Sequence, residues 1–177
     1  MRDATRDLHA ALDAASPLTT PGFDGEAYLA YARRVLGWMR PVERHLQAAG
    51  LPWPADLHMD ARASKSGWLL EDLGVDASPP DCPYTPRPQD LAGAYGLAYV
   101  CEGATLGGAY LYKRLSPALA PMPLRWLRGY GAQTGPLWKT FLAHLATDVT
   151  TPEAIDTAAQ AARAGFQTFE RWMRDIH

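Results

Sequence analysis

The segment AYVCEGATLGGAYLYKRL, residues 98–115, has the apolar spacing and the basic end of an α-helix. It contains no proline, yet it carries Gly103, Gly107 and Gly108 in its interior. Each glycine in a helix interior costs about 1 kcal/mol relative to alanine. A helix that keeps these glycines therefore needs a bare backbone at their positions.

The glycines of this segment are arranged in a pattern. Gly103 and Gly107 are four positions apart and share one helix face, while Gly108 beside them favours a bend. Gly93 and Gly96 come earlier on the same predicted helix, residues 89–115. Together these five glycines cost about 4 to 5 kcal/mol against alanine. Either another helix packs closely on the bare face, or a large flat ligand lies against it; the spacing leaves both explanations open.

The rest of the chain also predicts helices, and no segment alternates convincingly with a strand period. Asp24 is expected to cap a long helix that Pro41 kinks or ends early. Thr151 and Pro152 are expected to begin the last helix. The predicted helices, besides 89–115, cover residues 2–15, 25–48, 60–74, 137–149 and 151–176.

These helices predict an all-α, single-domain helical bundle over residues 1–177, with six to eight helices. Residues 78–88, SPPDCPYTPRP, contain five prolines, which no helix or central strand tolerates. We expect this segment to be an ordered surface connection within the domain.

Composition excludes several classes of protein. The chain has 177 residues and a net charge of −2, which argues against nucleic acid as the main partner. No apolar run approaches the ~20 residues of a membrane span, and no secretory leader is visible. Cys82 and Cys101 have no metal-site spacing and are typical of free thiols in a reducing compartment. We therefore expect a soluble, cytoplasmic protein.

One face of the first predicted helix carries a histidine and two arginines. At about 100° per residue, Arg2 and Arg6 lie within about 60° of His9. Imidazole is a common axial ligand of heme iron, and arginine suits carboxylates such as heme propionates. Arg2 lies about 10 Å along the axis from His9, which matches the reach from a macrocycle centre to its carboxylate edge. The alternative is an exposed helix with a solvated basic edge.

Other reactive side chains give weaker signals. The remaining histidines show no paired metal-ligand spacing, and no nucleophile elbow or phosphate loop occurs. Glu102, next to Gly103, is a candidate general acid, but a solvated or ion-paired helix glutamate is the more frequent situation.

Two motifs resemble those of heme oxygenases, most closely the bacterial branch that makes biliverdin beside bacteriophytochromes. They are ATRDLHAALD, residues 4–13, and YVCEGATLGG, residues 99–108. The similarity extends over nearly the whole chain and includes ASKSGWLLEDL, residues 63–73, and ARAGFQTFERW, residues 162–172.

The resemblance implies a role for each motif. His9 would be the proximal iron ligand, and Asp13 a carboxylate that orients its imidazole. Heme would lie between the first helix and a kinked, glycine-rich distal helix. Gly103, Gly107 and Gly108 would cover the other heme face, leave a small cavity for O2 and aim the oxygen at one meso carbon.

The resemblance also implies partners and products. Arg2, Arg6 and Arg163 would bind the propionates. Heme would be both substrate and cofactor, and the products would be biliverdin, carbon monoxide and ferrous iron. Electrons would come from a separate reductase or ferredoxin, because no flavin or nicotinamide motif is visible. A bacteriophytochrome would be a possible acceptor of the biliverdin.

One position departs from the family pattern. Many heme oxygenases have an aspartate directly after the first distal glycine, where it organises water near O2, and this chain has Ala104. This departure keeps open a non-catalytic heme carrier or sensor on the same fold. A pocket for another ligand, with His9 merely structural, is a further alternative.

Overall fold

The computed structural model describes Leu18, Thr20 and residues 22–62, 64–74 and 76–175, and all regular secondary structure among them is helical. This confirms the predicted all-α class for the described part of the chain. The helix expected at 2–15 lies outside the described residues. The elements are α2 (Gly25–Ala48), η2 (Ala55–Leu57), α3 (Met59–Arg62), α4 (Lys65–Leu73), α5 (Leu91–Leu115), α6 (Arg125–Arg128), η3 (Gly131–Gln133), α7 (Thr134–Asp148) and α8 (Pro152–Arg174).

The three longest helices, α2, α5 and α8, begin at side-chain caps, as the sequence predicted for two of them. Asp24 accepts a hydrogen bond from the Ala27 amide at 2.9 Å, and the Thr151 hydroxyl accepts one from the Ala154 amide at 3.2 Å. Both bonds satisfy amide groups that the first turn of a helix leaves without a partner. At α5 the cap is Asp90, so this helix begins at Leu91 and continues without interruption through its glycines to Leu115.

Pro41 does not end its helix early, which corrects one of the two outcomes expected for it: α2 continues to Ala48. A proline has no amide hydrogen, so the carbonyl of Gly37 loses its usual partner four residues on. The Cys82 amide fills this role and donates to the Gly37 carbonyl at 2.8 Å. The proline-rich connection is therefore ordered and packs on α2 at the position where the helix needs a donor.

Residues 60–74 form two helices and not the single one that periodicity predicted. α3 ends at Arg62 and α4 begins at Lys65. Glu43 of α2 accepts hydrogen bonds from the Lys65 amide at 2.6 Å and from the Ser66 amide at 3.1 Å. A carboxylate from a distant helix thus caps α4, and this contact has no local signature in the sequence.

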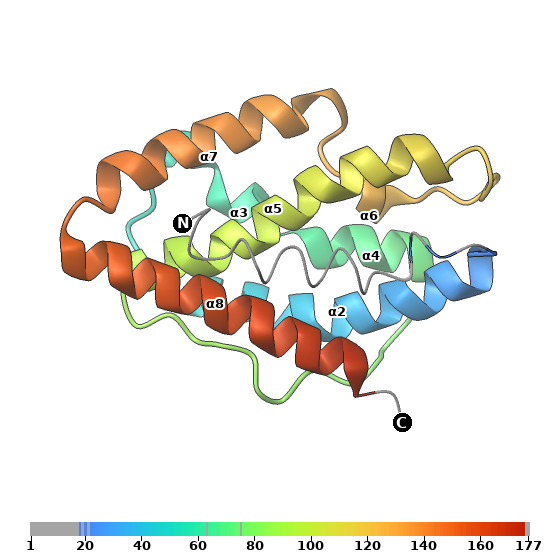
Figure 1. Cartoon of the computed structure of the whole chain (residues 1–177), viewed down its shortest axis with the longest axis horizontal. Helices are drawn as coiled ribbons and strands as arrows, with labels where there is room; N and C mark the ends of the chain where they lie inside the picture. The colour runs from blue at the N-terminus through green and yellow to red at the C-terminus, as the bar shows by residue number, and fades with distance from the viewer. Residues whose placement is uncertain (1–17, 19, 21, 63, 75, 176–177) are drawn as a thin grey trace.

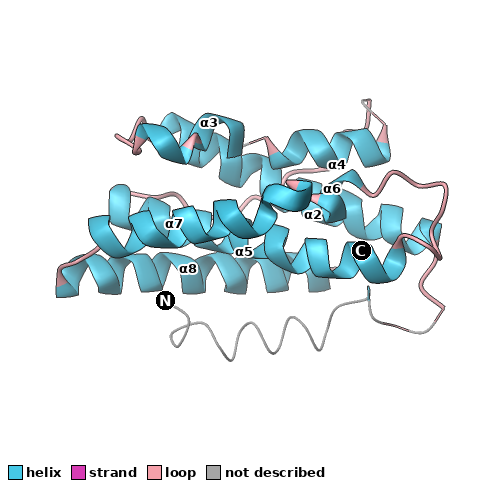
Figure 2. Cartoon of the chain, turned by 90° about the horizontal axis from the view of Figure 1, so that it is seen from above, coloured by secondary structure: helices cyan, strands magenta, loops and turns pink. Residues whose placement is uncertain are grey.

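α5 runs through the middle of the fold and contacts α8 more extensively than any other helix. The two helices run in the same direction and are closest near their first turns, where the backbone of Gly96 approaches Ala158. They then diverge along their length (Figure 1). In the second view, α3 and α4 lie on one side of α5 and α8 on the other (Figure 2).

The far end of α8 is attached to α2, which explains the divergence. The Trp172 indole donates to the Arg34 carbonyl at 2.8 Å. Its ring also fills the space beside Gly37, where a Cβ atom would lie 2.8 Å from it. Because α8 is bound to α5 at its start and to α2 at its end, it does not cover the second half of α5, which packs against α6 instead.

Gly96→Ala should destabilise the heme-free protein by about 1 to 3 kcal/mol, the usual cost of overpacking a core. A Cβ atom at Gly96 would lie 2.1 Å from the Ala158 carbonyl oxygen, so the helices must separate. Urea unfolding measures the change. Gly67→Ala in α4 is the matched control, since nothing lies within 4 Å of the added carbon. Equal stability of the two variants would contradict the close α5–α8 contact.

Candidate functional site

The structure describes four of the eight residues that the sequence singled out. Gly103, Gly107 and Gly108 lie in the second half of α5, and Arg163 lies in the middle of α8. The other predicted site residues, Arg2, Arg6, His9 and Asp13, lie outside the described residues, so their roles stay predictions.

Gly103 and Gly107 lie on a face of α5 that no helix of the described chain covers closely. A Cβ atom at Gly107 would meet nothing within 4 Å, and one at Gly103 would meet only the Trp138 ring, at 3.9 Å. Helix packing within the described part of the chain therefore does not explain these two glycines. A bare backbone facing open space is the arrangement expected where a flat ligand approaches a helix.

Gly96 and Gly108 are different, because packing does explain them. The position of a Cβ at Gly108 lies 3.4 Å from both the Cα and the carbonyl oxygen of Leu127 in α6. Gly108 is buried, whereas Gly107 beside it is exposed. Both explanations that the spacing left open are needed, since close packing accounts for some glycines of α5 and not for others.

Apolar side chains surround the bare face. Leu106 is 39% exposed and Tyr110 is 73% exposed, and these are two of the three exposed large hydrophobic residues among those described. At about 100° per residue, both lie within about 100° of Gly107 around the helix. We define the distal face of α5 as Gly103, Leu106, Gly107 and Tyr110. Its character is apolar, and Ala104 brings no carboxylate to it.

Arg163 is a partly exposed cation on α8, the helix that diverges from the distal face. Its side chain is 38% exposed, and the Nη2 atom lies 4.0 Å from the Asp156 carboxylate. Exposed ion pairs of this kind contribute little, with a median near 0–1 kcal/mol. The Arg163 guanidinium can therefore exchange this partner for the carboxylate of a ligand at low cost.

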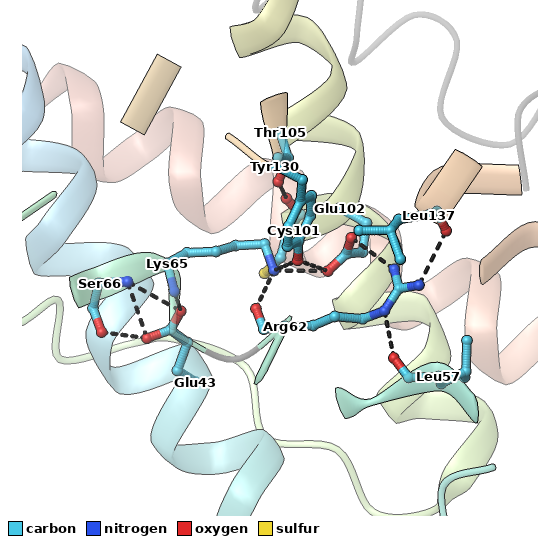
Figure 3. Close-up of polar contacts among 10 residues, drawn as sticks. All are labelled: Glu43, Leu57, Arg62, Lys65, Ser66, Cys101, Glu102, Thr105, Tyr130 and Leu137. Carbon is cyan, nitrogen blue, oxygen red and sulfur yellow. Dashed lines mark hydrogen bonds and ion pairs between the residues drawn. The ribbon is translucent and has the colours of Figure 1, made fainter. Parts of the chain in front are cut away.

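On the opposite side of α5 lies a buried charge cluster, shown in Figure 3, that we call the Glu102 cluster: Arg62, Lys65, Glu102 and Tyr130. The Glu102 carboxylate accepts hydrogen bonds from Arg62 Nη1 at 3.1 Å, Lys65 Nζ at 2.7 Å and the Tyr130 hydroxyl at 3.2 Å. Arg62 and Lys65 are each 2% exposed, and Glu102 is 3% exposed. The ion-paired interpretation of Glu102 is confirmed.

Burial and attraction set the protonation of the Glu102 cluster. Burial alone lowers the pKa of Lys65, but the interactions with Glu102, Tyr130 and Cys101 together outweigh it, so the pKa is raised and the ammonium keeps its charge. Burial raises the pKa of Tyr130 to about 12, so its hydroxyl keeps the proton that it donates to Glu102. With its oxygens held by three donors, Glu102 is not available as a general acid for a ligand on the distal face.

No pattern in the sequence indicated Arg62 and Lys65 as partners of Glu102. Each belongs to a different short helix, and their separation from Glu102 along the chain has no motif. The only available signal was a glutamate within an otherwise apolar helix, because a charge in such a position needs a partner.

A cavity of about 150 Å³ adjoins the Glu102 cluster, and its walls include Trp53, Met59, Ala98 and Cys101. Pockets for drug-sized ligands occupy about 300–1,000 Å³, so a macrocycle does not fit into it. The cavity also lies across α5 from Gly107. The distal face, and not this cavity, is therefore the candidate ligand site.

Two negative findings concern the described residues alone. They contain no group of three or more histidine, cysteine, aspartate and glutamate side chains that could hold a metal ion. None of their helices combines the length and the apolar character that crossing a bilayer requires.

Gly107→Ala should leave the stability of the heme-free protein unchanged or raise it by up to ~1 kcal/mol, because alanine favours helix and the added methyl group meets no neighbour. Thermal and urea unfolding of the heme-free protein measure this. A loss as large as that of Gly96→Ala would show that packing, and not a ligand, requires the glycine.

Comparison with known proteins gives one match. The family model described as heme oxygenase matches residues 1–175. Searches of curated proteins and of solved structures each found no match. The match covers the helix with the distal face, the Glu102 cluster and the predicted His9 motif together, and the chain therefore belongs to the heme oxygenase family of heme-degrading enzymes.

Proposed function

We propose that this protein uses O2 and electrons to cleave heme to biliverdin, carbon monoxide and ferrous iron, supplying a bilin chromophore, releasing iron, or both. The observation that carries the proposal is the distal face of α5. Gly103 and Gly107 have no packing reason to be glycine, and they lie in a chain whose family degrades heme.

The described residues fit a heme. Its macrocycle is flat and apolar, and the distal face offers bare backbone at Gly103 and Gly107 with Leu106 and Tyr110 beside it. Its propionates are anionic, and Arg163 offers a guanidinium that can bind a carboxylate through two hydrogen bonds. When bound, heme supplies the iron centre that activates O2 and is itself the compound degraded.

The remaining contacts are assigned to residues outside the described part of the chain. In this proposal His9 ligates the iron and Asp13 orients its imidazole. Arg2 and Arg6 bind the propionates together with Arg163. A histidine and two arginines on one face of the helix predicted at residues 2–15 support this assignment, as does the matched family model.

The glycines act by leaving space. Without Cβ atoms, the backbone at Gly103 and Gly107 can approach the macrocycle closely and still leave room for O2. Gly108 supports this arrangement from behind, because it lets α6 pack closely on α5. Ala104 has no carboxylate, although many heme oxygenases have an aspartate at this position. We propose that water held by main-chain carbonyl groups takes over the role of that aspartate.

Electron and product partners belong to this proposal as well. A separate reductase or ferredoxin would supply the electrons. A bacteriophytochrome would be one acceptor of the biliverdin.

Turnover of added heme with ascorbate, and then with a reductase, tests the function. Formation of biliverdin and carbon monoxide supports it, whereas stable heme binding without products would show the carrier or sensor instead.

His9→Ala should abolish normal iron ligation and most turnover, because His9 carries the only imidazole on that predicted face. Absorption and electron-paramagnetic-resonance spectra of the heme-loaded variant measure ligation. Added imidazole serves as the control, since it should restore part of the signal. Unchanged histidine-ligand spectra in the variant would remove His9 from the site.

Arg163→Glu should weaken heme binding or change the biliverdin isomer that forms, because it places a carboxylate near the propionates. Titration with heme and chromatographic separation of the isomers measure the two effects. Arg171→Glu is a matched control on the same helix, since Arg171 is exposed and pairs with Asp175. Affinity and isomer ratio equal to those of the control would make Arg163 an ordinary surface charge.

A further inference from the structure

We propose that Glu102 is a positioning residue, which Arg62 and Lys65 hold on the buried side of α5 so that Gly103 and Gly107 keep a fixed orientation on the opposite side. The inference rests on the proposed function, because it takes the distal face as the side of α5 on which heme binds. It does not follow from the family assignment, because it depends on contacts of this chain.

The distal face cannot fix its own orientation. Among the described residues, no atom lies within 4 Å of the position of a Cβ at Gly107, and the nearest one to Gly103 is in the Trp138 ring at 3.9 Å. α8 has already diverged from α5 at this point (Figure 1). The rotation of this part of α5 about its axis must therefore be set by contacts on its buried side.

The Glu102 cluster supplies these contacts at the right place. Glu102 directly precedes Gly103, so their side-chain directions differ by about 100°, and those of Glu102 and Gly107 by about 140°. Through its two cations, Glu102 is connected to both short helices, α3 and α4. Tyr130, in the segment after α6, adds a third donor at 3.2 Å.

The cations are themselves held by groups outside α5. Arg62 donates from Nε to the Leu57 carbonyl at 2.5 Å and from Nη2 to the Leu137 carbonyl at 3.1 Å, which connects η2 and α7. Lys65 Nζ donates to the Arg62 carbonyl and, at 3.1 Å, to the Tyr130 hydroxyl. Each donor to Glu102 thus has a second anchor, as the close-up shows (Figure 3).

Stability alone does not explain such a cluster. Well-packed apolar residues of similar volume are often as stable as a buried ion pair, or more so, because the charges must be stripped of water. Charged hydrogen bonds have one property that apolar contacts lack, a defined direction and length. A cluster of this kind therefore specifies where the helix lies as well as holding it.

A small rotation of α5 would matter for the chemistry. On a helix of radius about 2.3 Å, a rotation of about 20° moves each Cα atom by about 0.8 Å. Misplacement of reacting groups by about 1 Å can reduce a rate about a hundredfold. Gly103 and Gly107 set the distance between backbone and macrocycle, so the isomer of biliverdin should be sensitive to the same rotation.

Three variants test the proposal. Glu102→Asp keeps the charge and shortens the side chain. Glu102→Gln combined with Lys65→Met removes one charge of each sign, so the net charge of the cluster is unchanged and Arg62 keeps its hydrogen bonds to the Leu57 and Leu137 carbonyls. Tyr130→Phe removes a single donor and keeps both ion pairs and the ring contact with Trp68, so it remains informative if the others fold poorly.

The control is Asp148→Asn. Asp148 accepts a hydrogen bond from Tyr95, so this change perturbs α5 near its start, away from Gly103 and Gly107. The control distinguishes a changed orientation of the distal face from a general weakening of the contact between α5 and α7.

The first readout uses protein without heme. Hydrogen exchange of the amides at residues 103–110 should be at least about tenfold faster in the double variant and in Glu102→Asp than in the control, with a smaller increase in Tyr130→Phe. The second readout uses heme. The ratio of biliverdin isomers should change and turnover should fall about tenfold to a hundredfold, while the heme dissociation constant changes less than about threefold.

Exchange and isomer ratio equal to those of the control in a folded variant would overturn the proposal and leave the cluster a stabilising one. Failure of the unaltered protein to cleave heme would refute the proposed function instead. The exchange comparison would still decide whether Glu102 fixes the orientation of α5.

Discussion

The contact of bare backbone at Gly96 with Ala158 is the constraint on which the arrangement of the fold depends. It brings α5 and α8 together at their starts, and the Trp172 contacts with α2 draw the end of α8 away. Two attachments at opposite ends of one helix therefore place α8 on the first half of α5 and away from the second half. The second half carries Gly108, which packs on Leu127 of α6, together with Gly103 and Gly107, which no helix among the described residues covers closely.

This division shows what a spacing pattern can and cannot predict. The sequence identified α5 as a helix with too many glycines, and it identified the two possible reasons. It could not assign a reason to each glycine, since Gly96 and Gly107 look alike along the chain. Their difference comes from what lies opposite them, a carbonyl oxygen in one case and nothing within 4 Å in the other.

Local signals were predicted well and non-local ones were not. Asp24 and Thr151 cap their helices as expected, because a cap and its amide are three residues apart. The boundary between α3 and α4 depends instead on Glu43, a residue of α2. The continuation of α2 past Pro41 depends likewise on Cys82, whose amide replaces the missing helical donor. Neither partner can be found by periodicity.

At the candidate site, the two sides of α5 differ in chemical character. The distal face of α5 is apolar and bare, which suits a flat ligand that binds by surface contact and brings its own reactive metal. The buried side of the same two turns is charged and fully hydrogen-bonded, which suits a support that must not move. An enzyme whose substrate also supplies the reactive centre needs few reactive side chains on the distal face. The protein must mainly fix the position of its backbone relative to the ligand. A rigid, hydrogen-bonded polar cluster behind an apolar face can do this.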